Sequence, residues 1–260
     1  MTTGDPLTLR PVHAMDDLRE VTALFSAVWG RGPEGAPMPS EVLRAVEHAG
    51  GLVNAAYAGP DGPLVGAAVL TPTADGAGYS MIAAALPGQT DRGIGQALKE
   101  HQRRWALDHG MTSIRWTFDP LVSRNARFNL DKLGATAGDY DRSFYGSMLD
   151  EINGDDESDR LTARWDLANP MPSDTPPPDP ARSTVLALGP DRDPAYLTAG
   201  PQRWVRVPMD IVAVRRATPE QATAWRYAVR EFLEDALGSR LIATGMSRTG
   251  WYHLTQGVAP

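Results

Sequence analysis

Two glycines one residue apart, Gly93 and Gly95, stand just before a segment whose apolar residues have helical spacing, and Arg92 precedes them. The first N–H groups of a helix have no intrahelical partner, and together with the helix dipole they favour a bound anion. Glycine has no Cβ, so an anion can approach its backbone closely. The pattern therefore predicts a phosphate or pyrophosphate site, to which Arg92 adds positive charge.

This glycine pattern matches neither of the common nucleotide-binding loops. A dinucleotide-binding loop needs a third glycine where this chain has Leu98, and an acidic residue near the end of the next strand, where it has Arg115. A nucleoside triphosphatase loop needs lysine and then serine or threonine after Gly95, where the chain has Gln96 and Ala97. Two interpretations remain open: a phosphate-binding turn, or glycines that only let a helix pack closely on a strand.

Apolar periodicity and turn residues predict the elements that must position this loop. Strands are expected at 7–12, 52–58, 64–70, 79–86 and 113–120, with helices near 16–28, 40–50, 95–109 and 124–134. Further strands are expected at 141–149, 159–167, 183–189 and 203–211, with a helix at 219–238 and a hairpin at 240–254. This order predicts a mixed α/β sheet, with parallel pairing where a helix crosses between two strands.

A proline-rich segment divides the chain, because residues 169–181 can continue neither a helix nor a strand. We therefore expect a domain at 1–168, a linker or surface strap at 169–182, and a C-terminal extension at 183–260. The helix at 219–238 carries an apolar stripe that must be buried, so the extension is expected to pack on the first domain. The acidic run at 150–159 is expected to be a solvated loop.

Composition excludes several classes of protein. The chain has 260 residues, of which 42% are apolar, no cysteine, and a net charge of −7. Disulfides and thiolate chemistry are therefore excluded, and nucleic acid is not an expected partner. No apolar run is long enough to span a membrane, and the N-terminus lacks a signal-peptide pattern, so a cytoplasmic protein is expected. The five histidines lack metal-ligand spacing, so no metal is expected.

The segment around Arg92, Gly93 and Gly95 resembles motif A of the GNAT superfamily of acyl-CoA N-acyltransferases, in which such a turn opens the helix after the fourth strand. "RNARFNLDKLGA" resembles the superfamily's motif B, and the element order to about Leu167 is also similar. The resemblance implies a GNAT-like α/β fold, with a mixed, mostly antiparallel sheet flanked by helices. Residues 183–260 would form an additional α+β extension, loosely similar to the tail of a bacterial GNAT-containing family.

The resemblance also implies a co-substrate, an acyl-CoA such as acetyl-CoA or succinyl-CoA. Its pantetheine arm would pair with the backbone of the fourth strand, at Ala83, Ala85 and Leu86, where that strand and the next one splay apart. Its pyrophosphate would be held at the start of the motif A helix, by the following residues: Arg92, Gly93, Ile94, Gly95, Gln96 and Ala97.

Acyl transfer to an amine requires loss of a proton from the amine and relief of charge on the departing sulfur. Many members of the superfamily place a tyrosine acid where this chain has Leu130. The candidates for catalytic groups are therefore Asp119, at the end of the fifth strand, with Asn125 and Tyr145 following it. Each also has a structural interpretation, because Asp119 and Asn125 are common capping residues and Tyr145 can serve packing.

The expected function is transfer of an acetyl or succinyl-type group from acyl-CoA to the amine of a small metabolite, such as an amino acid. If the loose resemblance of the C-terminal third holds, Arg124, Arg127, Arg226 or Arg230 could bind the carboxylate of such an acceptor. The alternatives are a non-catalytic acyl-CoA-binding module with the same fold, or other acyl-CoA chemistry such as decarboxylation, and a homodimer is left open.

Overall fold

The chain divides into two compact units, Met1–Trp116 and Thr117–Pro260. The computed structural model describes residues 6–30, 35–89, 93–146, 156–168, 172–173 and 175–257. The domain boundaries expected at 168 and 183 both lie inside the second unit. Residues 117–168, which the sequence places in the first domain, group with the C-terminal segment in this division.

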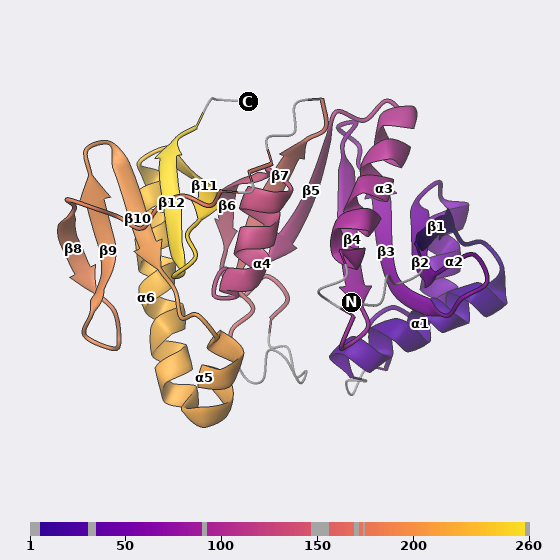
Figure 1. Ribbon diagram of the computed structural model, residues 1–260, viewed down its shortest axis with the longest axis horizontal. Helices are drawn as coiled ribbons and strands as arrows, with labels where there is room; N and C mark the ends of the chain where they lie inside the picture. Colours follow the sequence, from indigo (N-terminus) through magenta and orange to yellow (C-terminus); the bar gives the residue numbers. More distant parts are fainter. Residues whose placement is uncertain are drawn as a thin grey trace. The chain divides into compact units, whose positions relative to one another are not determined.

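The first unit contains a sheet whose first four strands are antiparallel neighbours in chain order (Figure 1). They are β1 (Leu7–Pro11), β2 (Leu52–Ala58), β3 (Leu64–Pro72) and β4 (Gly78–Ala85). Helix α3 (Ile94–Asp108) then crosses to β5 (Ser113–Phe118), which begins in this unit and pairs with β4 in parallel. The expected parallel pairing across a helix is confirmed, and the sheet is mixed but mostly antiparallel.

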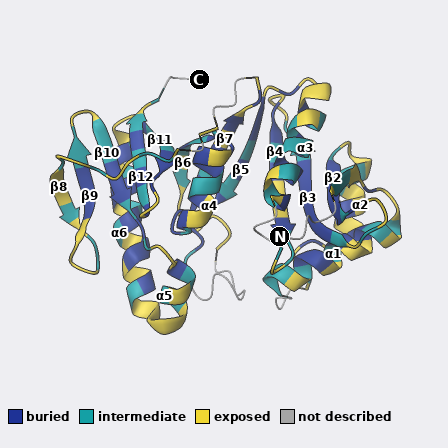
Figure 2. Ribbon diagram, viewed as in Figure 1, coloured by how far each residue is buried: buried dark blue, intermediate teal, exposed yellow. Residues whose placement is uncertain are grey.

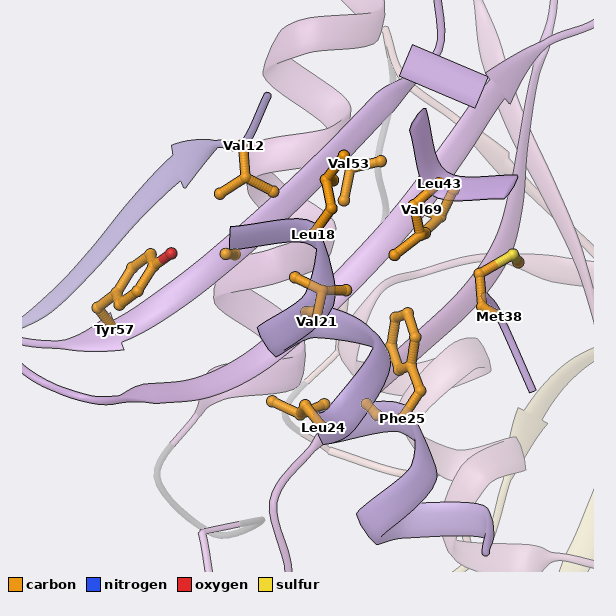
Figure 3. Close-up of a cluster of buried hydrophobic side chains, with 13 residues drawn as sticks. Val12, Leu18, Val21, Leu24, Phe25, Met38, Leu43, Val53, Tyr57 and Val69 are labelled. Atoms are coloured by element: carbon orange, nitrogen blue, oxygen red, sulfur yellow. The ribbon is translucent and has the colours of Figure 1, made fainter. Parts of the chain in front are cut away.

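Helices cover both faces of this sheet. The first core lies under α1 (Met15–Trp29) and α2 (Ser40–His48), and Figure 3 shows its side chains. Both strands and helices contribute to this core: Val53 of β2 and Val69 of β3 pack with residues of α1 such as Leu18 and Phe25. The second core, on the opposite face, includes Ile94 and Leu98 of α3. Because both faces are buried, β2 and β3 are continuous apolar runs rather than alternating ones.

Close packing of α3 on the sheet depends on Gly66 of β3 rather than on the glycines of the loop. A Cβ built at Gly66 would lie 2.5 Å from Ile94 Cγ2 and 3.0 Å from the Ala84 carbonyl oxygen. A further polar contact comes from buried Asn54, whose Nδ2 donates to the Leu98 carbonyl oxygen at 3.3 Å. These contacts fix the position of the first turns of α3 over β2, β3 and β4.

The described residues of the second unit form seven strands in the order β7-β6-β11-β12-β10-β9-β8. Their bounds are β6 (Thr136–Asp141), β7 (Arg160–Asp166), β8 (Thr184–Leu188), β9 (Pro194–Ala199), β10 (Gln202–Arg206), β11 (Leu241–Met246) and β12 (Trp251–Gln256). Its helices are α4 (Ser123–Arg127), the π-helix η2 (Phe128–Lys132), α5 (Ile211–Ala217) and α6 (Pro219–Gly238). The hairpin expected at 240–254 is confirmed as β11 and β12.

Three local expectations need correction. The strand expected at 141–149 is absent over 142–146, which form a turn, and the pairing strand β6 lies earlier, at 136–141. Residues 147–149 lie outside the described residues. Strand β9 and helix α5 were not expected, because the first has few apolar residues in alternation and the second is only seven residues long.

The C-terminal segment packs on residues 117–168 through the buried side of α6, which Figure 2 shows in dark blue. Its apolar stripe, Trp225, Val229, Phe232 and Leu233, is buried as expected. The segment also completes the sheet, because Ala243 of β11 pairs with Ala137 of β6. The buried hydroxyl of Tyr252 donates to the Pro120 carbonyl oxygen at 2.7 Å.

Removal of residues 169–260 should therefore destroy the second unit rather than release an independent tail. The truncated chain 1–168 would expose the surface that α6 covers and leave the β6 edge without β11, and exposed strand edges promote aggregation. We expect aggregation, or loss of a cooperative melting transition, in size-exclusion chromatography and circular dichroism. A monomeric truncated chain with an unchanged melting temperature would contradict this organisation.

Candidate cofactor and catalytic site

Strand β4 has an open edge on the side of β5. The two strands pair at Gly78 with Ile114 and at Tyr79 with Arg115, although β4 continues to Ala85. A register shift against β3 between Ser80 and Ile82 marks a β-bulge immediately beyond the paired residues, and bulges redirect a strand locally. The separation of β4 from β5 that the GNAT resemblance implies is thus present in the pairing of these strands.

The backbone of Ala83 and Ala85 faces this open edge. Leu86 N–H donates to the Val65 carbonyl oxygen of β3 at 2.9 Å. In an antiparallel ladder, residues that bond to the neighbouring strand alternate with residues whose N–H and C=O groups point the other way. Ala84 therefore bonds to β3, whereas Ala83 and Ala85 present their backbone groups on the β5 side. The Leu86 side chain packs on the first core instead.

Helix α3 begins at a turn that leaves space above its backbone. Gly93 is the N-cap, in the left-handed region with φ 74°, and a Cβ built there would meet nothing within 4 Å. Close packing of the helix on a strand therefore does not require a glycine at this position. The left-handed backbone conformation is what favours glycine here. The interpretation in which the glycine pair serves packing alone is not supported for Gly93. Arg92 lies outside the described residues.

The donors available at the helix start are fewer than the resemblance implied. The N–H of Ala97 donates to the Gly93 carbonyl oxygen at 2.9 Å, so helical hydrogen bonding has already begun there. This corrects the expectation that Ala97 contributes a donor. The N–H groups of Ile94, Gly95 and Gln96 precede the first intrahelical bond and remain available for an anion. The Ile94 side chain is fully buried, so this residue can contribute its backbone alone.

A buried lysine lies beside the open edge, and sequence reasoning did not single it out. Lys99 of α3 is 5% exposed, and its Nζ donates to Ser80 Oγ of β4 at 2.9 Å. Ser80 Oγ in turn donates to Gln102 Oε1 at 2.9 Å. Nζ also lies 3.7 Å from the centre of the Trp116 ring of β5. Burial lowers the pKa of Lys99 to about 7, whereas the Trp116 ring face favours the charged ammonium.

In the second unit, Asp119 belongs to a buried ion cluster. Its carboxylate accepts hydrogen bonds from Arg226 at 2.9 and 3.1 Å and from Arg215 at 2.6 Å. Asp156 contacts the same two guanidinium groups, and none of the four side chains is more than 8% exposed. Burial alone would raise the pKa of Asp119, but the charges and hydrogen bonds of Arg226 and Arg215 outweigh it and hold that pKa well below its ordinary value. Such a carboxylate is a poor proton acceptor.

The acidic run is not the solvated loop that we expected, where the structure describes it. The Asp159 side chain is fully buried and accepts from Arg230 at 2.8 and 2.9 Å and from the Tyr140 hydroxyl at 2.6 Å. Glu157 pairs with Arg230 as well. The expectation failed because the matching arginines lie about 70 residues later, on α6. Arg226 and Arg230 are accordingly occupied by the chain's own carboxylates.

The other catalytic candidates lie at the surface of the second unit. The Tyr145 side chain is 50% exposed, and its hydroxyl lies 3.4 Å from Thr117 Oγ1 of β5. The Phe144 ring meets that of Tyr145 edge to face, at 4.7 Å between centres. Asn125 is exposed on α4. Leu130, at the position where a tyrosine is common, is 2% exposed and belongs to the core. Of the catalytic candidates suggested by the sequence, Tyr145 and Asn125 are thus the ones with exposed polar groups.

Comparison with solved structures identifies the fold. A putative acetyltransferase from Salmonella typhimurium, determined with its cofactor acetyl-CoA, matches with a TM-score of 0.51 and 15% identity, over 68% of this chain and 100% of that one. An N-acetyltransferase from Staphylococcus aureus matches with a TM-score of 0.50 and 12% identity, over 63% and 99%. An acetyltransferase of the GNAT family from Streptococcus pneumoniae matches at 0.49 and 15%, over 61% and 98%. No protein-family model matches the sequence, and no curated protein was found as a relative.

The fold is therefore that of the GNAT acetyltransferases, with additional C-terminal strands, as the sequence resemblance implied. Among the helices in the described ranges, none is long and apolar enough to cross a membrane. The described residues likewise contain no group of three histidine, aspartate or glutamate side chains that could hold a metal ion.

Replacement of Gly93 by asparagine should abolish stabilisation by coenzyme A. A ligand that binds the native state at a hundred times its Kd stabilises it by about 2.7 kcal/mol, so coenzyme A should raise the melting temperature of the wild type in a concentration-dependent way. Asparagine tolerates the left-handed conformation, so Gly93→Asn should fold, but its side chain would occupy the space above the helix start. Melting curves with increasing coenzyme A measure the effect.

Gly76→Asn is the matched control, because Gly76 also has a positive φ, of 78°, and open space around a built Cβ, but lies in the β3–β4 turn. It should keep the full shift in melting temperature. An equal shift in folded Gly93→Asn would show that the pyrophosphate does not lie at the start of α3.

Replacement of Lys99 by methionine should change how stability depends on pH. The pKa of Lys99 is lowered to about 7 in the folded protein, and an unfolded lysine has a pKa of about 10.4. Between these values the unfolded state binds the additional proton, so stability rises with pH, by at most about 1.4 kcal/mol per pH unit. The free energy of unfolding of the wild type should therefore increase relative to Lys99→Met from pH 7 to pH 10, with no such change below pH 7.

Urea unfolding of both proteins across this range measures the difference, and subtraction of the two curves cancels the other titrating groups. A constant difference from pH 6 to pH 10 would mean that the amine stays charged beside Trp116.

Proposed function

We propose that this protein is an acyl-CoA-dependent N-acyltransferase that transfers an acetyl or succinyl-type group to the amine of a small metabolite. The observation that carries the proposal is the open backbone edge of β4 at Ala83 and Ala85, followed by the N–H groups at the start of α3. The first can pair with the amides of a pantetheine arm, and the second can bind a pyrophosphate. The GNAT fold supports the same assignment.

The transfer itself requires no covalent enzyme intermediate. The amine attacks the thioester carbonyl directly, loses a proton, and the coenzyme A thiolate leaves. We propose Tyr145 as the proton donor to the thiolate, because its exposed hydroxyl is not committed to a carboxylate in the described residues. Asn125 is proposed as a hydrogen-bond donor to the reacting groups. Asp119 is better explained as a residue that holds Arg215 and Arg226 in place, since these two side chains occupy its carboxylate.

Two of the four arginines that the sequence suggests for the carboxylate of an amino-acid acceptor are already occupied. Arg226 and Arg230 already bind carboxylates of the chain and are therefore poor partners for the carboxylate of a substrate. A small amine remains the proposed acceptor class.

A non-catalytic acyl-CoA-binding module is the second candidate, and two observations favour it. Leu130 fills the position of the common tyrosine with a buried apolar side chain, and Asp119 is held as an ion-paired carboxylate. In this alternative, the cofactor cradle would bind acyl-CoA without transfer.

Release of free thiol from acetyl-, succinyl- and malonyl-CoA across a panel of small amines distinguishes the two candidates. Amine-dependent release, with the acylated amine found by mass spectrometry, would establish the enzyme. If an acyl-CoA stabilises the protein and no amine releases thiol from it, the binding module is the correct function.

Tyr145→Phe should lower turnover with the best amine by about 10²–10⁴-fold while leaving the shift in melting temperature by coenzyme A intact, since a positioned acid contributes in this range. Tyr227→Phe is the matched control, because Tyr227 is also exposed, at 45%, and its hydroxyl donates to Glu157. It should retain wild-type turnover. If turnover of Tyr145→Phe stays within a few-fold of the wild type, Tyr145 is not the acid and positioning of the reactants accounts for catalysis.

A further inference from the structure

The second unit contains a hollow of about 380 Å³ that the proposed acyl transfer does not use. Three kinds of element line it. Arg127 ends α4, Asp131 and Lys132 belong to η2, and Arg248 lies in the turn between β11 and β12. Ser173 and Pro176 of the proline-rich segment complete the wall. We call the residues 172–173 and 175–181 the strap.

The three cations in this hollow have no ion-pair partner among the described residues. No carboxylate lies within 4.0 Å of the charged nitrogens of Arg127, Lys132 or Arg248 there. Asp131 is the one carboxylate among the described lining residues. The lining residues that the structure describes therefore carry a net positive charge, in a chain whose net charge is −7.

Asp131 supplies a buried polar atom without a partner. Its side chain is 4% exposed; Oδ1 accepts a hydrogen bond from Met246 N–H at 3.3 Å, and Oδ2 has no hydrogen-bond partner. Burial raises the pKa of Asp131 to about 6, against the opposing effects of the Met246 N–H and of Arg127. A buried oxygen that lacks a partner costs free energy, and the Asp131 carboxylate is the described group in this hollow whose charge would oppose a bound anion.

A π-turn brings the charged residues to one place. Leu133 N–H donates to the Phe128 carbonyl oxygen, five residues earlier, at 3.0 Å. A π-turn has more than four residues per turn. Asp131 and Lys132, which are four and five positions after Arg127, therefore lie on the same side of the helix as Arg127. Such turns are rare and are frequently found at functional sites.

The strap is fitted closely to this region. Ser173 N–H donates to the Asp131 carbonyl oxygen at 2.7 Å, and Asp179 accepts a hydrogen bond from the Thr249 hydroxyl. A Cβ built at Gly245 would lie 2.9 Å from Pro177 Cγ and 3.2 Å from Asp131 Oδ1, so the strap approaches β11 where a glycine permits it. Proline has a fixed φ and no backbone N–H, so the prolines of the strap restrict its backbone and offer no donor to a ligand. Hydrogen-bond donors to a ligand in the hollow would therefore come mainly from the three cations.

We propose that this hollow is a binding site for a small polyanion of the phosphate or polycarboxylate class, held by Arg127, Lys132 and Arg248. Two guanidinium groups and an ammonium are suitable donors to phosphate or carboxylate oxygens. A guanidinium group can donate two parallel hydrogen bonds to two oxygens of the same anion. The volume is within the range of small-molecule sites. The site consists entirely of residues of the second unit, and the inference does not depend on the proposed acyl transfer.

Isothermal titration of the full chain tests the proposal. The probes are phosphate, tripolyphosphate, succinate and citrate, each at an ionic strength held constant with sodium chloride so that general screening does not vary. We expect saturable binding of at least one probe, and the comparison of phosphates with carboxylates identifies the class. If no probe binds, the proposal is wrong.

Variants locate the bound anion. Arg248→Gln and Arg127→Gln should each weaken binding roughly ten-fold or more, since a hydrogen bond to a charged group contributes about that factor. Asp131→Asn should tighten binding, because it removes the negative charge and keeps an acceptor for Met246 N–H. Arg164→Gln is the matched control, since Arg164 is an exposed arginine of β7 that does not line the hollow. It should bind as the wild type does.

Gly93→Asn separates this site from the helix start of α3, where an anion is also expected. Binding that persists in Gly93→Asn and is lost in Arg248→Gln belongs to the hollow. Equal binding by the wild type, Arg127→Gln and Arg248→Gln, or weaker binding by Asp131→Asn, would overturn the proposal. Melting curves of each variant establish that it is folded.

Discussion

The buried pairing of Asp119 with Arg226 is the interaction on which the second unit depends. Asp119 directly follows β5, and Arg226 lies on α6, 107 residues later. Loss of one partner of such a pair costs about 3–5 kcal/mol, because a buried charge is left uncompensated, whereas replacement of both by apolar residues is often neutral. Arg215 and Asp156 complete a cluster with no net charge. The cluster therefore acts mainly by specifying which helix packs beside residue 119, and it makes the C-terminal segment part of the same unit as the strands before it.

The first unit is organised by a different constraint, the close approach of α3 to the sheet. Gly66 leaves no room for a Cβ beneath Ile94, whereas Gly93 has open space above it and a backbone conformation that favours glycine. The two glycines thus have separate roles, one in packing and one in shaping the helix start. The bulge in β4 lies next to this helix and coincides with the end of its pairing to β5. The position of the helix start thus depends on Gly66 and Gly93, and the free strand edge begins at the bulge in β4.

Much of the fold could be predicted from the sequence, because local patterns determine it. The apolar runs of β2 and β3, the glycine turn before α3 and the helix at 219–238, which begins at a proline, are all predicted from neighbouring residues. The side-chain partners could not be predicted in this way. Asp156 and Asp159 belong to a run that is typical of a solvated loop, and their arginines are about 70 residues distant in sequence. Lys99 was missed for a similar reason: its burial depends on Trp116, in a different element. The π-turn of η2 departs from α-helical spacing by a single residue, which no sequence pattern marked.

The charges of the second unit separate into two groups, and the separation bears on function. Arg215, Arg226 and Arg230 are at least 88% buried and face carboxylates at hydrogen-bonding distance. Arg127, Lys132 and Arg248 line a hollow in which Asp131 is the one carboxylate among the described lining residues. In an acidic protein, carboxylates are plentiful, so unpaired cations that gather around a hollow are not explained by a shortage of partners. Like charges brought together by a fold repel one another, and a bound anion removes that cost. The carboxylate of Asp131 offsets only one of the three positive charges among the described lining residues, so the repulsion that a bound anion would relieve remains.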